Sequence, residues 1–327
     1  MTTILSRRIL LSALPVLAAP SIVRAADFPT RPLRAIVPFP PGGGVDVFAR
    51  PFAQALAAVL GQSVVIENQG GASSRLGSAG VGRATPDGHT LLITNDTLAA
   101  VEALPVAGGS PILPTLAPVL LAVGSPQLLL THPRSGIPHI AAYAERVQNP
   151  ARRPNTAVPG LGTAHHFVSA LFNQAVGGRV EHVPYRGGGP VVADLLAGTV
   201  DAAVLTLGAA VEHIRDGRLV GLAVTSPTRA VALPDVPTVA ETVAPGFEIL
   251  TWMGVLAPAA TPAPVVSRLQ AAGLAALEDL TLRARLGALG FDPIGGGPER
   301  FGTLLRDTVA RFAAVAPLAS IRAEEGA

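Results

Sequence analysis

Short apolar runs alternate with amphipathic stretches in the first third of the chain. The runs rich in β-branched residues are LRAIVPF, SVVIENQ and GHTLLITN, and each predicts a buried strand. The stretches VDVFARPFAQALAAVLG and RLGSAGVGRA separate these runs and have helical periodicity. This alternation is typical of parallel βαβ units with right-handed crossovers.

A second series of the same kind begins near residue 154. Its predicted strands are PNTAVPG, VEHVPY, VDAAVLTL and LVGLAVTS, and its predicted helices are TAHHFVSALFNQAVG, PVVADLLAGT and AVEHIRDGR. Two extended apolar segments, LAPVLLAVGSPQLLLTHP and FEILTWMGVLAPAATP, flank this series, and the chain is helical from Pro264 onward. We therefore predict two α/β lobes with a ligand cleft between them, lobe 1 comprising 26–122 and 251–327 and lobe 2 comprising 123–250.

The first 25 residues have the pattern of an export signal. Arg7 and Arg8 precede an apolar run that is too short to span a bilayer, and Val23 and Ala25 occupy the −3 and −1 positions of a cleavage site. We expect cleavage near Ala25 and a periplasmic location. The arginine pair also resembles a twin-arginine signal, although nothing in the sequence decides between the two export routes.

Composition excludes several classes of function. Removing residues 1–25 takes away three arginines and leaves 21 basic against 22 acidic residues, which gives no electrostatic basis for binding nucleic acid. The chain has no cysteine and no lysine, so thiol catalysis, Schiff-base chemistry and a P-loop lysine are excluded. His165 and His166 are adjacent and lack metal-ligand spacing. We expect no metal and no cofactor.

Two glycine-rich loops stand at predicted strand-to-helix junctions. Gly42–Gly44 precedes a helix that Asp46 could cap, and the loop fits neither G-x-G-x-x-G nor a P-loop. Alone it could be a tight turn without a ligand. Gly160, Gly162 and Thr163 form a similar junction in the second series. Free N–H groups at both helix starts would suit two anionic groups across a cleft.

An exported hydrolase is the alternative reading of the second loop. Thr163 would be its nucleophile and His166 its base, but the chain contains no G-x-S-x-G motif. A threonine three residues before a histidine at a helix start is better explained as a helix cap.

Several motifs together resemble the solute-binding receptors of tripartite tricarboxylate transporters, the TctC or Bug-type family. They are IVPFPPGGGVD, VVIENQGGA, TPDGHTLL, GLGTAHHF, HVPYRGGGPVVADLLAGTVD, LAVTS with ALPDVPTVAE, and WMGVLAPAATP, in order over nearly all of the chain after residue 25. The resemblance implies a monomeric, type II-like, two-lobed periplasmic binding protein that closes on a small carboxylate. It also implies delivery to a membrane permease of one large and one small subunit, although a signalling partner is an alternative.

The resemblance also implies which residues bind the ligand. They are Phe39, Pro40, Gly42, Gly43, Gly44, Val45 and Asp46 in the first loop, Gly160, Gly162, Thr163, Ala164 and His166 in the second, and Asp201.

The chain departs from the family pattern at four places in this region. Val45, Ala164 and Leu205 stand where relatives usually have a hydroxyl, another small polar group or an Asp. Arg75 follows an altered loop, NQGGASSR, and is expected near the rim of the cleft. Because hydroxyls could bond carboxylate oxygens directly or through water, their loss predicts a ligand with a larger apolar part or a monocarboxylate.

Overall fold

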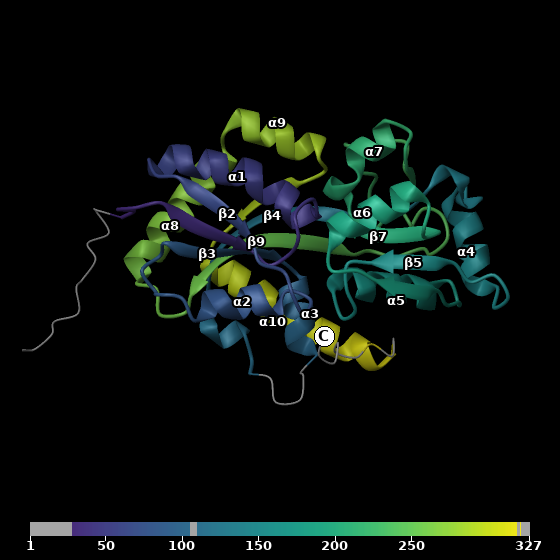
Figure 1. The fold of residues 1–327 in the computed structure, drawn as a ribbon, viewed down its shortest axis with the longest axis horizontal. Coiled ribbons are helices and arrows are strands. Elements are labelled where there is room, and N and C mark those ends of the chain that lie inside the picture. The colour runs from purple at the N-terminus through teal and green to yellow at the C-terminus, as the bar shows by residue number, and fades with distance from the viewer. Residues whose placement is uncertain (1–27, 105–109, 319–320, 322–327) are drawn as a thin grey trace, which may run out of the picture.

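The computed structural model describes residues 28–104, 110–318 and 321, and it has two α/β lobes side by side (Figure 1). The predicted signal peptide, 1–25, lies outside the described residues. None of the helices in the described part of the chain is both long enough and apolar enough to cross a membrane. The two-lobed α/β class expected from the sequence is confirmed.

Lobe 1 has a mixed sheet with helices on both faces. Its strands are β1 (Leu33–Val37), β2 (Val64–Asn68), β3 (Thr90–Asn95), β9 (Leu250–Pro258), β10 (Asp292–Gly296) and the first part of β4 (Leu116–Thr131). Its helices are α1 (Gly44–Leu60), α2 (Arg75–Gly82), α3 (Thr97–Ala103), α8 (Ala263–Leu277), α9 (Leu280–Ala288) and α10 (Pro298–Leu318), with a 3₁₀ turn at Leu113–Thr115.

Lobe 2 repeats this layered arrangement around a smaller sheet. Its strands are β5 (Asn155–Val158), β6 (Glu181–Pro184), β7 (Ala202–Thr206), β8 (Val220–Val224) and the second part of β4. Its helices are α4 (Ile140–Gln148), α5 (Ala164–Ala175), α6 (Gly188–Ala197) and α7 (Val211–Arg215), with 3₁₀ turns at Pro133–Ser135 and Leu207–Ala209.

The two sheets are continuous because β4 belongs to both. Its 16 residues pair with β9 as far as Pro126, and from Gln127 onward they pair with β7 and β8. The strand order along the main path is β2-β1-β3-β9-β4-β7-β5-β6. The lobe boundary predicted after residue 122 therefore falls inside β4, before the change of partner at Gln127.

Parallel pairing brings the functional loops together. β1 pairs in parallel with β2 and β3, and β5 pairs in parallel with β6 and β7. The carboxyl ends of both sets face the space between the lobes, which is where ligands bind in open α/β sheets (Figure 1).

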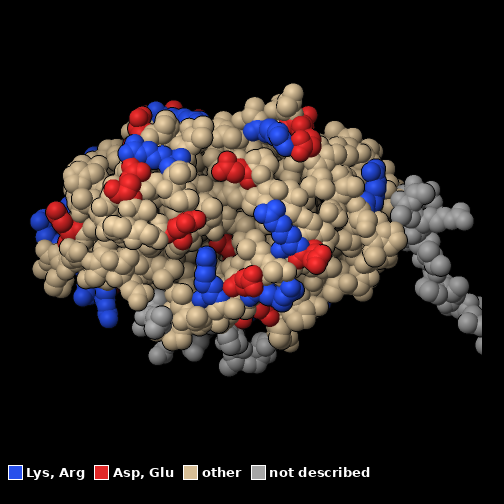
Figure 2. Space-filling view, turned by 180° about the vertical axis from the view of Figure 1, so that it is seen from behind, with Lys and Arg blue, Asp and Glu red and all other residues tan. Residues whose placement is uncertain are grey.

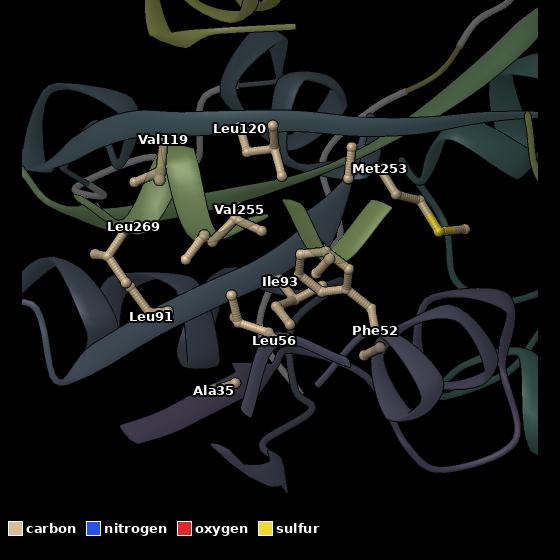
Figure 3. Packing of buried hydrophobic residues seen from close by; sticks show 14 of the residues in the cluster. Ala35, Phe52, Leu56, Leu91, Ile93, Val119, Leu120, Met253, Val255 and Leu269 are labelled. Atoms are coloured by element: carbon tan, nitrogen blue, oxygen red, sulfur yellow. The ribbon is translucent and has the colours of Figure 1, made fainter. Parts of the chain in front are cut away.

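The lobe 1 core holds the first loop in place. Side chains from β1, β3, β4 and β9 pack against α1 and α8, as the labelled residues of Figure 3 show. Phe48 and Phe52 stack within α1 with ring centroids 5.2 Å apart, and both are fully buried. Burial of this face of α1 fixes its direction, so its N-terminus points at the other lobe. The opposite face of the sheet is covered by α2, α3 and α10.

The surface charge agrees with the near-neutral composition expected after export. Figure 2 shows arginine and acidic side chains interspersed over one face of the molecule. Several arginines of the chain lie in ion pairs, including Arg34 with Glu67 at 2.7 Å and Arg229 with Glu241.

Candidate functional site

A small pocket lies where the two lobes meet, and we call it the inner pocket. It has a volume of about 20 Å³, which is little more than one water-sized group needs. It is lined by Phe39, Gly43, Gly44, Val45, Asn95, Thr97, Pro159, Thr163, His165, Gly188, Leu205 and Thr206. None of these lining residues carries a charged side chain apart from the ionisable His165.

A much larger cavity opens beside the inner pocket, and we call it the outer cavity. Its volume is about 550 Å³. It is lined by Pro38, Phe39, Pro40, Gly70, Gly71, Ala72, Ser73, Ser74, Leu76, Pro159, Tyr185 and Arg186. Phe39 and Pro159 line both spaces, so they form the boundary between the two.

Asp46 stabilises the first loop from within. Its carboxylate accepts hydrogen bonds from the Gly42 N–H at 3.0 Å, from Arg50 at 2.8 and 2.9 Å and from the Asn68 amide at 2.9 Å. Burial opposes ionisation of Asp46, but these bonds outweigh it and lower its pKa. The bond to Gly42 resembles half of a capping box. Gly42 and Asp46, which were predicted at the ligand, thus pair with each other and do not line the inner pocket.

The N–H groups that follow Gly43 have no acceptor in the described part of the chain. Gly43 is the N-cap of α1 and caps it with no side chain, so the N–H groups of Gly44 and Val45 remain unpaired. Both residues line the inner pocket. Such N–H groups, with the positive end of the helix dipole, attract an anion.

The second loop is held by its own hydrogen bonds. The Thr163 hydroxyl donates to Gly160 O at 2.7 Å and accepts from the His166 N–H at 3.4 Å, which makes Thr163 the N-cap of α5. The Gly162 N–H donates to His166 Nδ1 at 3.0 Å. Of the predicted loop residues, Thr163 lines the inner pocket, whereas Gly160 and Gly162 do not.

The two neighbouring histidines have different positions. His166, predicted as a ligand contact, points into its own loop, and burial followed by nearby His182 lowers its pKa to about 3. His165 lines the inner pocket with 7% of its surface exposed, and its Nε2 lies 3.2 Å from Thr206 Oγ1. Its Nδ1 has no partner among the described residues, and burial lowers its pKa to about 4, so the ring is neutral.

The hydrolase alternative lacks the contact it needs. Thr163 Oγ1 bonds to Gly160 O and to the main chain of His166, and no hydrogen bond joins it to the His166 ring. A nucleophile and its base have to lie within hydrogen-bond reach.

Of three further predictions about this region, two are wrong in position. Asp201 precedes β7 at the end of the strand away from the pocket, where it accepts the Asn155 N–H at 2.9 Å. Ala164 packs in the lobe 1 core beside Phe167 and does not line the pocket. Arg75 lies near the rim of the cleft as expected, since it lines a small cavity with Leu161 and Gly162 of the opposite lobe. Its guanidinium donates to the carbonyls of Val101 and Leu104 at the end of α3.

Several residues that line the inner pocket were not predicted from the sequence. Asn95 and Thr97 flank the start of α3, and Thr206 ends β7. Gly188 begins α6, and its N–H group has no acceptor among the described residues. At the start of α5 only the His165 N–H is unpaired in the same way, because Ala164 donates to Thr97 Oγ1 and His166 to Thr163 Oγ1. The start of α6 could have been found, because Gly187–Gly189 repeats the triple glycine of Gly42–Gly44 before a helix. Among the described residues, no group of three or more His, Asp or Glu could hold a metal ion.

The lobes are in contact across the cleft, in part through glycines. A Cβ added to Gly44 would lie 2.6 Å from Thr206 Cβ, and one added to Gly189 would lie 2.2 Å from Pro41 O. The Ser73 hydroxyl donates to Leu161 O at 2.9 Å from the opposite lobe. The structure is therefore a closed form, in which only glycine permits this approach.

Comparison with known proteins identifies relatives over almost the whole chain. Residues 48–318 match the family described as tripartite tricarboxylate transporter family receptor. The protein BugT of Bordetella pertussis is 34% identical over 301 residues, which is 91% of this chain and 92% of BugT.

Solved structures with the same fold include proteins with bound carboxylates. The periplasmic binding protein BugD has a TM-score of 0.85 and 32% identity, covering 90% of this chain and 99% of BugD. MatC from Rhodopseudomonas palustris with bound malate has a TM-score of 0.80 and 32% identity, covering 88% and 99%. An R. palustris protein with adipate has a TM-score of 0.84 and 31% identity, covering 90% and 99%.

Proposed function

Since the chain belongs to the tripartite tricarboxylate transporter receptor family, we propose that it captures a small carboxylate in the inner pocket and delivers it to a membrane permease of one large and one small subunit. The convergence of three helix N-termini on that pocket carries the proposal. The unpaired N–H groups of Gly44, Val45, His165 and Gly188 start α1, α5 and α6 around a space that contains no cationic side chain. Such an arrangement suits one carboxylate group.

Neutral donors surround the same space and would complete the coordination. Thr97 and Thr206 contribute hydroxyl groups and Asn95 contributes an amide, and all three side chains are almost fully buried. Asn95 Oδ1 accepts the Thr97 N–H at 3.1 Å, which leaves the NH₂ end of the amide for the ligand. Hydrogen bonds from neutral groups to an ion are among the stronger ones in proteins.

The relatives support both the ligand class and the cellular location. Malate and adipate in two structures of the same fold are dicarboxylates, and BugD is named as a periplasmic binding protein. Export of this chain would use the predicted signal peptide of residues 1–25, with the protein acting as a monomer that performs no chemistry. Closure would store the ligand until the permease opens the cleft, because only the closed form brings the three helix starts together.

Calorimetry of the protein against a panel of small carboxylates, sugars and cations tests the proposal. We expect binding of at least one carboxylate and no binding of neutral sugars. Replacing Gly44 by Pro would remove one N–H group and clash with Thr206, so we expect this variant to lose carboxylate binding. Stabilisation by a sugar or a cation, with no response to any carboxylate, would contradict the proposed function.

A further inference from the structure

The outer cavity carries a single charged side chain and a mostly apolar wall. Of its described lining residues, only Arg186 is charged, and Arg186 forms no hydrogen bond or ion pair with any described residue. Pro38, Pro40 and Leu76 supply apolar surface, and Leu76 is 64% exposed. An unpaired guanidinium above exposed apolar surface is well suited to an anion with an apolar body.

The loop that carries Arg186 is fixed on both sides. The Tyr185 N–H donates to Val158 O at 2.9 Å, and the Tyr185 hydroxyl donates to Asp194 at 2.6 Å. Gly187 has φ of 130° and lies so close to Pro40 that a Cβ would meet its ring at 2.5 Å. The main chain of Arg186 is thereby held at the cavity, although its side chain is exposed.

The sizes of the two spaces constrain the ligand. The inner pocket, at about 20 Å³, has room for the head of a carboxylate and not for the rest of an organic acid. The outer cavity, at about 550 Å³, adjoins it across Phe39 and Pro159. A ligand with its head in the inner pocket must therefore extend between these two residues into the outer cavity.

We propose that the outer cavity is a second subsite, in which Arg186 binds the anionic far end of an elongated ligand whose carboxylate head occupies the inner pocket. The ligand class is a dicarboxylate with an apolar body long enough to join the two spaces. This inference rests on the proposed function, since it takes the inner pocket as the site of the first carboxylate. It assigns selectivity for length and for the second charge to Arg186.

Three carboxylates that share either chain length or charge distinguish selectivity for length from selectivity for the second charge. Suberate has eight carbons and two carboxylates, octanoate has eight carbons and one carboxylate, and succinate has two carboxylates on four carbons. Their affinities for the wild type, Arg186→Gln and Arg152→Gln are measured by calorimetry. Arg152 is the control, because its side chain is exposed and has no partner among the described residues, and because it lies in the α4–β5 connection, away from the cleft.

We expect the wild type to bind suberate more tightly than octanoate or succinate. Arg186→Gln should weaken suberate binding by about five- to tenfold, the range of one partly exposed charge-assisted contact, and leave octanoate unchanged. Arg152→Gln should change neither affinity. Because Arg186 has no structural partner, the melting temperature of Arg186→Gln should equal that of the wild type.

Two results would overturn the second subsite. One is an equal loss of suberate and octanoate affinity in Arg186→Gln, and the other is a wild type that binds succinate or octanoate at least as tightly as suberate. Failure of the wild type to bind any carboxylate would instead contradict the proposed function itself.

Discussion

At the start of α5, the side chains of two consecutive histidines have different surroundings, because successive residues of a helix point about 100° apart. His166 points back into its loop and accepts a main-chain N–H, whereas His165 points into the inner pocket. The sequence identified this pair as belonging to the site but assigned the contact to His166. Spacing alone could not decide between them, because the direction of each ring depends on the exact start of the helix.

We predict that His165→Phe weakens carboxylate binding by about tenfold while the protein remains folded. Phenylalanine keeps the volume of the ring but removes the unpaired Nδ1 and leaves the Thr206 hydroxyl without its partner. The loss of one hydrogen bond to an ion is about 1.5 kcal/mol. Calorimetry would measure it, and an unchanged dissociation constant would show that the ring only fills space.

The second prediction concerns acid stability. The pKa values of His165, His166 and His182 are lowered to about 4, 3 and 4, mainly by burial, below the ordinary value of 6.5. The unfolded chain therefore binds more protons than the folded one below pH 6.5, and the stability these residues contribute is lost as the pH falls from about 6.5 toward 4. Burial raises the pKa of Asp96 to about 7, which has the opposite effect, but three histidines outweigh one aspartate.

His166→Asn should reduce this loss of stability. The asparagine oxygen can still accept the Gly162 N–H, and the amide does not titrate. Denaturant unfolding at pH 7 and pH 4.5 measures the difference for the wild type and the variant. His139→Asn is the matched control, since His139 is exposed and also accepts a main-chain N–H, from Ala142. If His139→Asn and His166→Asn had the same effect, burial of His166 would not be the cause.

At the scale of elements, helices and strands with a strong periodicity of apolar residues were predicted correctly from the sequence. The apolar strands β1, β2 and β3 and the amphipathic helices α1 and α5 lie where the sequence placed them. The strand β10 has the sequence DPIGG and was not predicted, because proline and glycine have low β-propensity. Its pairing with β4 comes from tertiary contact. The same limit applied to the two glycine-rich loops of the site. Residue spacing does not reveal which N–H groups are bonded within a loop and which remain free for a ligand.

The loop before α2 contains strained backbone. Ala72, Ser73 and Ser74 all have positive φ, at 45°, 50° and 82°, a conformation that costs a non-glycine residue about 1 kcal/mol or more. Ser74 is also buried, and its hydroxyl is without a partner in the described part of the chain. This loop lines the outer cavity, and Ser73 donates a hydrogen bond to the opposite lobe.

We predict that Ser74→Gly stabilises the protein by about 1 kcal/mol, because glycine adopts positive φ freely and removes an unpaired hydroxyl. Thermal unfolding would detect this as a rise of a few degrees in the melting temperature. Ser74→Ala is the comparison, since it removes the hydroxyl and keeps the strain, and it should stabilise less. A lower melting temperature for Ser74→Gly would mean that the hydroxyl has a role that the closed form does not display.

For the whole molecule, the contact between the lobes includes places that leave no room for a side chain. Gly189 at the start of α6 faces Pro41 O in the other lobe, at a distance from the place where Phe167 of α5 packs on Phe312 of lobe 1. A substitution at Gly189 therefore changes the relation between the lobes more than the lobes themselves.

We predict that Gly189→Ala weakens carboxylate binding by tenfold or more, because its Cβ would lie 2.2 Å from Pro41 O and keep the cleft from closing fully. Small-angle scattering should show a smaller ligand-induced compaction than in the wild type. Gly287→Ala in α9 is the control, since its Cβ would meet nothing within 4 Å. Normal compaction in Gly189→Ala would show that the lobes can meet by another route.

The shared strand β4 has a consequence for the ancestry of such proteins. Because one unbroken strand supplies both sheets, any junction between the lobes has to cut through paired residues such as Gln127 and Thr206. Recombination that exchanged one lobe for that of a distant relative would have to restore the pairing of β4 with the new sheet. New ligand preferences would thus arise by point changes and by insertions at the strand ends, and the two halves would be inherited as a single unit.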